Sequence, residues 1–467
     1  MKITSSYKAE IIGMKNIFLP TVKAYQAALR YLIGVYDAEW EFIQCLNGTK
    51  RRFNRAERLV HGTKGNKAKY PEFDRMFYKM PSYLRRSAIQ AALGAVASYR
   101  SLVKNWESGG CKGAKPKLQC SRNSMPVFYR GDMFKETENP FVVNLKLLHK
   151  NDWVWVPIQL LPTDVRYLQH HWAHCKPSAP TLEKHYGKYY LRFAYEENVS
   201  LNQTPIKDQT ICAVDLGVNT DAVCCIMRSD GTVAARKFVN FPADKDHLSH
   251  VLNRIKRTVR ENGAKSTHGE WMYASRINRE HAIQVAAAIF DFAKNNNVDT
   301  IVFEHLDFKG KIKGSKKQRL HMWRKNDIQA LVEHRAHRNG MHVSRICAWG
   351  TSKLAFDGSG EVLRGRIGLS EQERSELLAM SPKERKASKG RPETHCGQEL
   401  CTFQNGKEYN CDLSASYNIG ARYFIREILK PLSETARSPL LAKVPEAERR
   451  TSATLSTLLR LHDAMAA

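Results

Sequence analysis

Long apolar runs and acidic residues are both scarce in this sequence. No apolar run approaches the roughly 20 residues that span a bilayer, and the segment Met1–Glu10 lacks the apolar stretch of a secretory signal. We therefore exclude an intrinsic membrane protein. Asp and Glu number 46 against 74 Lys and Arg, so the net charge is +28. So large an excess of like charge in a compact fold indicates a polyanionic partner, with a merely soluble basic protein as the alternative.

The cysteines and histidines show no regular ligand pattern. The eleven cysteines are odd in number and scattered, which favours reduced thiols in a cytosolic compartment, with room for one metal cluster, over a disulfide framework. The seventeen histidines show no convincing metal-ligand spacing, and His170–His171 is predicted to lie in a loop. The chain has no short internal repeat. Its composition, 42% apolar and 26% charged, is typical of a globular protein of two or more domains.

The N-terminal part begins with a short extended segment and then shows helical periodicity. Apolar residues recur at three- and four-residue steps over 22–46 and again over 82–106, which predicts two helices. Between them, the segment 50–69 carries eight basic residues against the single acid Glu57. From about residue 125, runs rich in β-branched and aromatic residues predict strands at 141–147, 153–158 and 189–195 and favour a β-barrel or small sandwich.

In the following region, predicted strands and helices alternate as in an α/β domain. Strands are predicted at 211–216, 222–227 and 233–239, with Asp230-Gly231 as the hairpin turn between the last two. A long helix and a buried strand at 300–303 come next. Two antiparallel hairpins followed by a helix and a parallel strand indicate a mixed sheet of the RNase H type.

Three acids stand at the ends of these predicted elements. Asp215 lies near the end of the first strand, Glu304 directly follows the strand at 300–303, and Asp412 opens an amphipathic helix. Each alone also fits a structural role, as a turn acid, a strand-end ion pair or a helix N-cap. Together they match what two-metal phosphodiester cleavage requires, because carboxylates from separate elements must converge on a pair of hard cations.

The residues around these acids resemble a known family. The segments 213–219, 301–306 and 410–422, of which the third is the most specific, resemble the three RuvC segments of TnpB proteins, the RNA-guided nucleases of insertion sequences and relatives of compact type V CRISPR effectors. Residues 80–90 and 112–117 look like that family's recognition helix and basic junction. The resemblance implies that Asp215, Glu304 and Asp412 are the catalytic, Mg²⁺-binding triad of a two-ion site in a prokaryotic, nucleoid-associated protein.

The resemblance also implies a multidomain α+β fold, with a wedge-like β-barrel that carries an inserted helical recognition lobe. An RNase H-like RuvC domain with a small nuclease-lobe insertion follows. In this sequence, we expect the first strand or strands of the barrel at 1–20, the recognition lobe at 21–124, the remainder of the barrel at 125–207, the RuvC domain at 208–346 and 411–430, the insertion at 347–410 and a tail at 431–467. The tail is interpreted either as a short helix or as disordered.

The sequence departs from the family at the insertion. TnpB proteins typically carry two Cys-x-x-Cys pairs that bind zinc there, whereas the segment 349–359 has no cysteine. Structural zinc needs four convergent thiolate or imidazole ligands. The candidates are Cys396, Cys401 and Cys411, completed by either His395 or Cys347; the alternative is an insertion that folds without metal.

Two basic clusters are candidate nucleic-acid contacts. The first belongs to the segment 50–69, and the second lies in a glycine-containing loop after Glu304, which in the family is a mobile lid over the RuvC cleft. The predicted contact residues are Lys50, Arg51, Arg52, Arg55, Lys313, Lys316, Lys317 and Arg319. A solvated surface loop is the alternative for the second cluster.

We therefore expect a Mg²⁺-dependent, RNA-guided DNA endonuclease whose partners are a guide RNA and double-stranded target DNA. It would recognise a short adjacent DNA motif, and pairing of the guide with the target strand would supply sequence specificity. Two alternatives remain open: a guided DNA-binding repressor that does not cleave, and an unguided RNase H-like resolvase or transposase. The guide's source, an insertion-sequence end or a CRISPR array, is a property of the locus.

Overall fold

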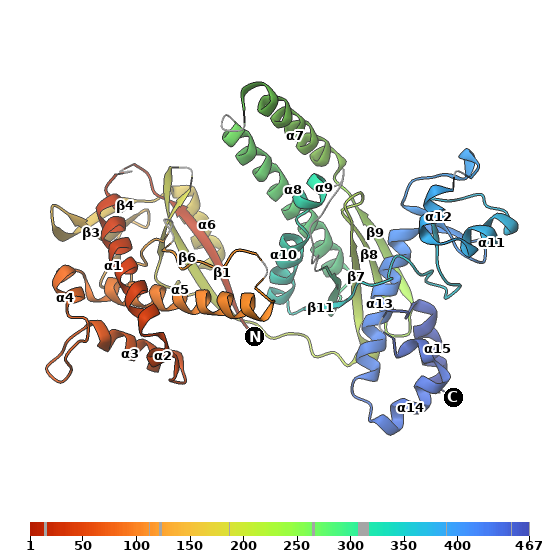
Figure 1. Cartoon of the computed structure of the whole chain (residues 1–467), viewed down its shortest axis with the longest axis horizontal. Helices are drawn as coiled ribbons and strands as arrows, with labels where there is room; N and C mark the ends of the chain where they lie inside the picture. The colour runs from red at the N-terminus through yellow and green to blue at the C-terminus, as the bar shows by residue number, and fades with distance from the viewer. Residues whose placement is uncertain are drawn as a thin grey trace. The chain divides into compact units, whose positions relative to one another are not determined.

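The computed structural model describes residues 1–13, 16–111, 113–120, 124–185, 187–263, 267–306, 317–388, 390–449 and 451–466. The chain forms two compact units, one of Lys2–Asn198 and one of Met1 with Val199–Ala467. We call them the N-terminal and C-terminal units (Figure 1). None of the described helices is both long and apolar enough to cross a membrane.

The N-terminal unit combines two small sheets with a group of helices. Its strands are β1 (Lys2–Glu10), β2 (Phe134–Glu136), β3 (Val142–His149), β4 (Asp152–Gln159), β5 (Thr181–His185) and β6 (Lys188–Asn198). Its helices are α1 (Phe18–Ala38), α2 (Trp40–Gln44), α3 (Thr49–Val60), α4 (Glu72–Met76), α5 (Ser82–Ser108) and α6 (Pro162–Trp172). A single apolar core joins α1, α5 and the inward faces of the strands.

The strands of this unit form two open three-stranded sheets, in the orders β1-β6-β5 and β2-β3-β4. In β3, burial alternates along the strand because Val143, Leu145 and Leu147 point inward, as expected of a sheet with one covered face. Isolated bridges such as Ile11 with Leu160 connect the two sheets. The predicted multidomain α/β class is confirmed, but the wedge-like β-barrel is not closed: among the described residues, these bridges do not extend into ladders that would close the two sheets on each other.

The helices differ from the prediction at two places. The helix predicted over 22–46 is interrupted at Glu39, whose ψ of 16° ends α1 before α2 begins. The apolar pattern continues through the break because Trp40 and Ile43 stay buried. The predicted loop at His170–His171 is also wrong, because both residues belong to the last turn of α6.

The C-terminal unit is built on a five-stranded sheet in the order β11-β10-β7-β8-β9. Its strands are β7 (Thr210–Leu216), β8 (Ala222–Arg228), β9 (Val233–Val239), β10 (Thr300–His305) and β11 (His342–Cys347). β7, β8 and β9 pair antiparallel, whereas β10 pairs parallel with both β7 and β11. The predicted mixed sheet is confirmed.

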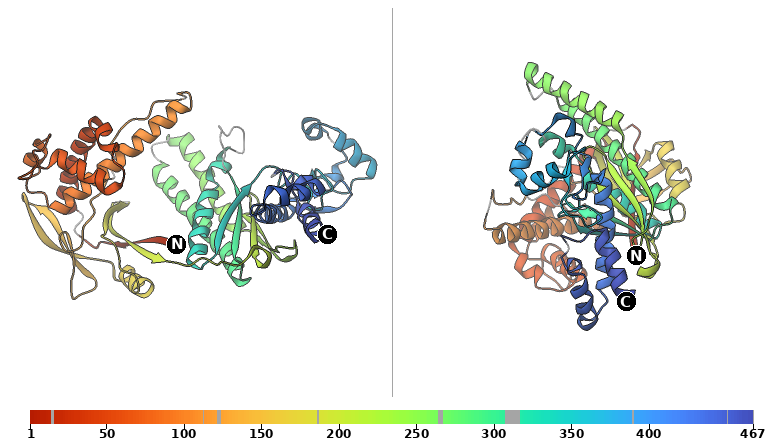
Figure 2. Two further views of the ribbon diagram at one scale, coloured as in Figure 1. Left: turned by 90° about the horizontal axis from the view of Figure 1, so that it is seen from below. Right: turned by 90° about the vertical axis from the view of Figure 1, so that its right-hand side faces the viewer.

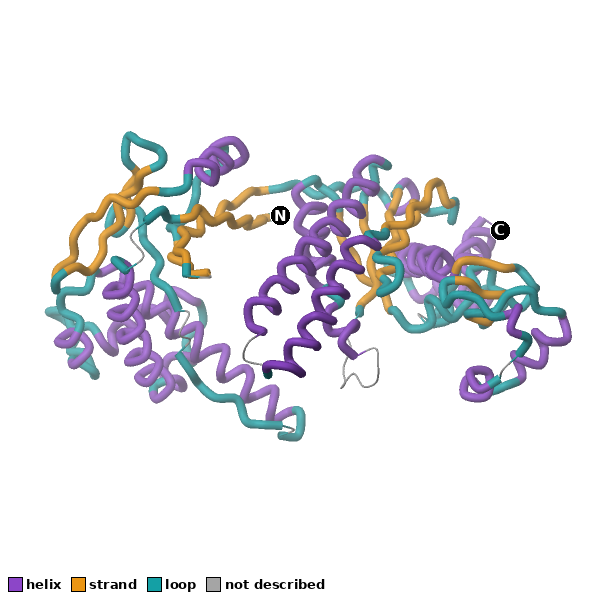
Figure 3. Tube along the Cα trace, turned by 90° about the horizontal axis from the view of Figure 1, so that it is seen from above, coloured by secondary structure: helices purple, strands orange, loops and turns teal. Residues whose placement is uncertain are grey.

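Helices cover both faces of this sheet, so its central strands are almost continuously buried. The helices α7 (Pro242–Asn262), α8 (His268–Asn295), α9 (Lys317–Met322) and α10 (Lys325–Arg338) precede α13 (Cys411–Leu429). The side chains of α8 and α10 pack on one face, with Cys212 and Val214 of β7. α13 packs on the other face, with Ile211 and Ala213. Figure 3 shows α7 and α8 as a long antiparallel pair.

An insertion separates β11 from α13. It contains β12 (Leu363–Arg364), α11 (Glu371–Ala379), α12 (Pro382–Ala387), β13 (Leu400–Thr402) and β14 (Glu408–Asn410), and the strands form their own small sheet. In Figure 2 it extends from the α13 side of the large sheet. Short 3₁₀ helices lie at Ile206–Asp208, Pro392–Thr394 and Pro445–Ala447.

The segment after α13 belongs to the core of the C-terminal unit. It forms α14 (Glu434–Lys443) and α15 (Leu455–Ala466), and Leu455, Leu458 and Leu461 pack in the same apolar cluster as α13. α15 also lies against the turn between β8 and β9. There Gly231 has a φ of +86°, and a Cβ on it would stand 2.8 Å from Leu459 Cδ2.

Candidate active site

Asp215 and Glu304 occupy neighbouring positions on adjacent strands. The parallel register pairs Phe303 of β10 with Val214 of β7, so the two acids come next on their strands. Neighbouring strands lie about 4.8 Å apart, and successive side chains point to opposite faces. Val214 and Phe303 face α8, so Asp215 and Glu304 point to the other face of the sheet, the one covered by α13.

Asp412 comes to the same face in the first turn of α13. The helix begins with Asn410 as its cap, because the Asn410 side chain accepts a hydrogen bond of 2.9 Å from the Leu413 amide. Asp412 is thus left free of the capping role that the sequence also allowed. Gly420 lets α13 approach the sheet closely, since a Cβ there would stand 2.8 Å from Met227 Sδ and 3.3 Å from Ala213 Cβ.

Arg364 of the insertion is the basic partner of these acids. Its Nη2 donates to Asp412 Oδ1 at 2.7 Å, and its Nε donates to the Gln398 carbonyl at 2.6 Å. Its positive charge lowers the pKa of both Asp412 and Asp215 against the stronger opposing effect of burial. Arg364 therefore connects the insertion electrostatically to the acids.

The acids are held in an environment that disfavours their charged forms. Burial raises the pKa of Asp215 well above its ordinary value, and the negative charges of Glu304 and Asp412 raise it further. Burial likewise raises the pKa of Glu304 and of Asp412. Carboxylates that repel one another in a desolvated site are suited to a cation, which would supply the missing opposite charge.

The spacing of the acids bears on how many cations they suit. In the described part of the chain, the ligand oxygens of the three acids do not all lie within 4.8 Å of one another. The three carboxylates are oxygen ligands of the kind that suit hard divalent cations such as Mg²⁺, but their spacing does not gather all three around a single ion.

Glu304 is positioned by a buried network. The Thr351 hydroxyl donates to its carboxylate, and this bond lowers the pKa that burial raises. Gln329 Nε2 donates to the Glu304 carbonyl at 2.9 Å. Asn418, which is fully buried on α13, donates to the carbonyls of Thr351 and Leu354 at 3.0 and 2.9 Å. Asn418 therefore acts on the site through the loop that carries Thr351.

Arg422 holds that loop against the segment before α15. Its guanidinium donates to the carbonyls of Cys347, Trp349, Thr451 and Ala453 at 3.0, 2.7, 2.9 and 3.0 Å. The side chain is only 5% exposed, and its charge also lowers the pKa of Glu304. One buried cation thus links α13, the Thr351 loop and the C-terminal segment.

The candidate zinc ligands do not gather into one cluster. Cys401 and Cys411 are buried and hydrogen-bond with each other, whereas His395 Nδ1 lies 3.0 Å from the Arg391 carbonyl. Cys396 is half-buried and Cys347 is exposed. Although all five residues are described, no three of them bring their ligand atoms within 4.8 Å of one another.

The predicted basic contacts are only partly described. Lys50, Arg51 and Arg52 are exposed on α3, and the Arg55 guanidinium stacks over the Phe42 ring at 4.2 Å. Together with neighbours such as Arg58 and Lys67, Arg51 and Arg55 line a hollow of about 720 Å³. Lys313 and Lys316 lie outside the described residues, as do the side chains of Lys317 and Arg319 at the start of α9.

Sequence reasoning missed Thr351, Arg364 and Arg422, which reach the acids only through the fold. Arg422 offered one signal: it is a charged residue on the buried side of an otherwise apolar helix, where an unpaired charge is costly. Thr351 and Arg364 lie in loops and short strands, and no local pattern marks them.

Comparison with known proteins shows the fold. The model of the Aq_aa04 family matches residues 3–149, which is less than half of the chain. No curated protein matches. The Cas12f1 chain of a complex with sgRNA and target DNA is 15% identical with a TM-score of 0.51, and the match covers 86% of this chain and 81% of that one.

Two other solved structures match with lower TM-scores. Cas12i in complex with crRNA and double-stranded DNA is 11% identical with a TM-score of 0.43, and the match covers 90% of this chain and 74% of that one. AacC2c1 bound to sgRNA is 10% identical with a TM-score of 0.38, covering 88% and 66%. The Cas12f1 likeness establishes the multidomain α/β architecture, and the other two add no argument to it.

Proposed function

We propose that this chain is an RNA-guided DNA endonuclease of the TnpB type, with one active site formed by Asp215, Glu304 and Asp412. The observation that carries the proposal is the meeting of three desolvated carboxylates, from β7, β10 and α13, on one face of the sheet. The likeness in fold to Cas12f1, which was solved with sgRNA and target DNA, supports a guided enzyme.

In this proposal the three acids hold two Mg²⁺ ions, which would supply the charge that activates water and stabilises the leaving oxygen. The chain's own residues set the geometry. Thr351 orients the Glu304 carboxylate, Asn410 caps α13 and so fixes Asp412, and Arg364 stands beside Asp412 where a phosphate backbone would enter. A guanidinium there is suited to phosphate because its donors form a planar fork.

The excess of positive charge supports nucleic-acid partners. A net charge of +28 suits a chain that neutralises the phosphates of a guide RNA and of target DNA. Guide pairing would supply sequence specificity, and the protein would read a short adjacent motif in the DNA. We propose the exposed face of α3, with Lys50, Arg51, Arg52 and Arg55, as one surface that binds phosphates.

The first test is the nucleic acid that the protein carries. RNA extracted from the gently purified full chain should contain one discrete species whose sequence supplies a guide. A target DNA matching that guide should then be cut in the presence of Mg²⁺. Absence of bound RNA, together with cleavage of branched DNA, would favour an unguided resolvase and refute the proposal.

The second test separates cleavage from guided binding. Asp215→Asn should lower the cleavage rate by at least about 10³-fold, because a metal-binding carboxylate is removed. Guided binding to target DNA should persist. If the parent protein binds its target but never cuts it, the chain is a guided repressor. The matched control is Asp230→Asn, which changes an exposed acid in the β8–β9 turn, away from the three acids.

The third test concerns α3. Changing Lys50, Arg51, Arg52 and Arg55 to Gln should weaken nucleic-acid binding and make it less dependent on salt. The slope of log binding constant against log salt concentration should decrease in magnitude by about 0.7–0.9 for each phosphate that the protein no longer neutralises. A control that removes the same charge elsewhere, at Lys430, Arg437, Lys443 and Arg449, should leave the salt slope unchanged. Equal effects from the two sets would show that net charge, and not the α3 surface, is responsible.

A further inference from the structure

A second group of metal-ligating side chains lies in the N-terminal unit, apart from the acids described above. His174 and Cys175 lie in the turn after α6, beyond its cap residue Ala173, and the Cys175 amide donates to the Trp172 carbonyl at 3.0 Å. The chain then runs along β6, where Pro177 bridges Tyr195 and the Ser178 amide donates to the Ala194 carbonyl at 2.8 Å. This path brings the turn to the end of β6, where Glu197 lies.

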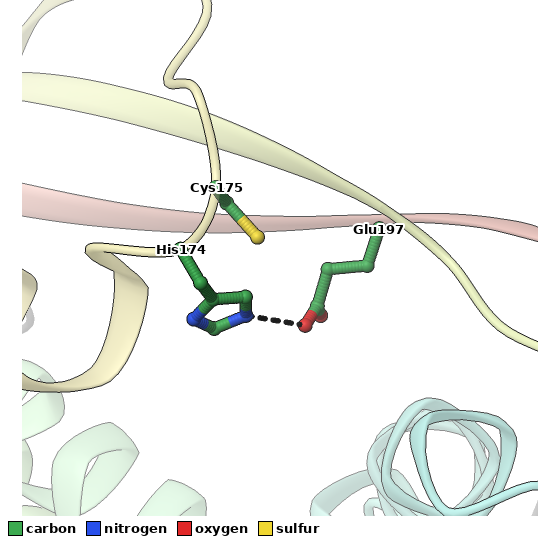
Figure 4. Close-up of side chains that lie close together, drawn as sticks. All are labelled: His174, Cys175 and Glu197. Atoms are coloured by element: carbon green, nitrogen blue, oxygen red, sulfur yellow. Dashed lines mark hydrogen bonds and ion pairs between the residues drawn. The ribbon is translucent and has the colours of Figure 1, made fainter.

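The three side chains converge, as Figure 4 shows. His174 Nε2 lies 3.2 Å from Glu197 Oε1, and the ligand atoms of His174, Cys175 and Glu197 all lie within 4.8 Å of one another. Two ligands at roughly 2.0–2.1 Å from a tetrahedral zinc ion stand about 3.3 Å apart. The His174–Glu197 spacing is therefore close to that of two ligands of one zinc ion.

Aromatic stacking holds His174 in place, and strand pairing holds Glu197. The His174 ring stacks on Trp172, with centroids 6.2 Å apart and an interplanar angle of 17°, and Trp172 stacks in turn on Tyr195 at 5.0 Å. Trp172 is 2% exposed, so this column is anchored in the core. Glu197 belongs to the central strand of its sheet and pairs with Ile3. The Glu197 side chain is 15% exposed and that of His174 is 61% exposed, which leaves an entry path from solvent.

We propose that His174, Cys175 and Glu197 bind a zinc ion. One sulfur, one imidazole nitrogen and one carboxylate oxygen suit a borderline cation such as Zn²⁺, whereas Mg²⁺ prefers oxygen ligands alone. Binding releases the Cys175 thiol proton to solvent, because the thiolate is the ligand. A water molecule takes the fourth position, so the site is of the open type with three protein ligands and differs from the closed four-ligand site that the sequence suggested for the insertion. The ion ties the turn after α6 to the end of β6, next to the point where the chain leaves the N-terminal unit.

The site is independent of the proposed nuclease activity, so its test does not use cleavage. The full chain, stripped of metal with a chelator, is titrated with Co²⁺, whose thiolate and tetrahedral absorption bands report zinc-type sites. We expect a thiolate band that saturates at one equivalent of thiolate-bound Co²⁺ and that added Zn²⁺ removes; Co²⁺ held by carboxylates alone gives no such band. Cys175→Ser should abolish that band, and Glu197→Gln should weaken Co²⁺ binding at least about tenfold.

Matched variants separate this site from the other cysteines. Cys45→Ser changes an exposed thiol of the same unit, and Cys401→Ser changes the buried pair of the insertion; both should keep the band. Without metal, the Cys175→Ser protein and the wild type should have the same melting temperature. Added Zn²⁺ should raise the melting temperature of the wild type only. A thiolate band that survives in Cys175→Ser, or that disappears in Cys401→Ser, would overturn the proposal.

Discussion

Arg422 provides the sharpest test of how the candidate site is held together. Its guanidinium satisfies four backbone carbonyls at 2.7–3.0 Å while only 5% exposed. Arg422→Ala leaves those carbonyls without their donor and removes the positive charge that acts on Glu304. Breaking a buried charged network by deleting one partner typically costs about 3–5 kcal/mol. We expect that loss in the free energy of unfolding of the C-terminal unit.

The measurement is urea denaturation, supported by thermal melting. A loss of this size should lower the melting temperature by about 10 °C, since each kcal/mol is worth about 2–4 °C in a unit of this length. Cleavage should fall more than the folded fraction does, because the loop that carries Thr351 loses its anchor. Arg422→Lys should be intermediate, since an ammonium keeps the charge but lacks the guanidinium fork.

Arg426, one helical turn away, is the matched control. It donates to the Arg345 carbonyl at 3.0 Å and to Ser344 Oγ at 2.6 Å, but its side chain is 33% exposed. Arg426→Ala should therefore cost about 1 kcal/mol. The reasoning would be refuted if Arg422→Ala destabilised the protein no more than Arg426→Ala, or if its activity fell only in proportion to stability.

Three further predictions follow from the same region of the structure. Gly420→Val should destabilise the C-terminal unit by about 1–3 kcal/mol in urea, because the new side chain meets Met227 and Ala213; unchanged stability would mean that α13 is not tightly seated. The hydrogen bond from Thr351 lowers the pKa of Glu304, so Thr351→Val should raise that pKa and move the acid limb of the pH–cleavage profile to higher pH. An unchanged acid limb would show that Glu304 is not the group whose titration produces it. Burial raises the pKa of Asp215, so in the presence of a chelator the wild-type melting temperature should fall as the pH rises from about 4 through that raised pKa. The Asp215→Asn protein cannot ionise at this position, so its melting temperature should fall less with pH and should rise less on addition of Mg²⁺. Parallel curves of melting temperature against pH for the two proteins would contradict this account.

The sequence predicted four of the five strands of the central sheet because they are short and bounded by turn residues, whereas β11 was not predicted. β9 spans 233–239 as expected, and β7, β8 and β10 agree with their predicted spans to within two residues. The three acids were found for the same reason, since each stands where such an element ends or begins. Local patterns carry this information because burial on both faces makes β7, β8 and β10 nearly continuous apolar runs.

Other features depend on tertiary interactions that no local pattern records. Glu39 interrupts a helix although the apolar stripe continues to Ile43. Whether two small sheets close into a barrel depends on edge pairing, which apolar periodicity does not report. Arg364 reaches Asp412 across 48 positions of the chain, and this ion pair appears only once the insertion has folded.

The seating of α15 on α13 sets an order of events during translation. Asp215 and Glu304 leave the ribosome long before Asp412, and the carbonyls of Thr451 and Ala453 that complete the Arg422 anchor emerge later still. Because domains generally fold as they are synthesised, from the N-terminus onward, the large sheet can assemble while its third acid is still inside the exit tunnel. The acid cluster is therefore incomplete until Asp412 has emerged, and the Arg422 anchor is complete only when the segment before α15 has docked.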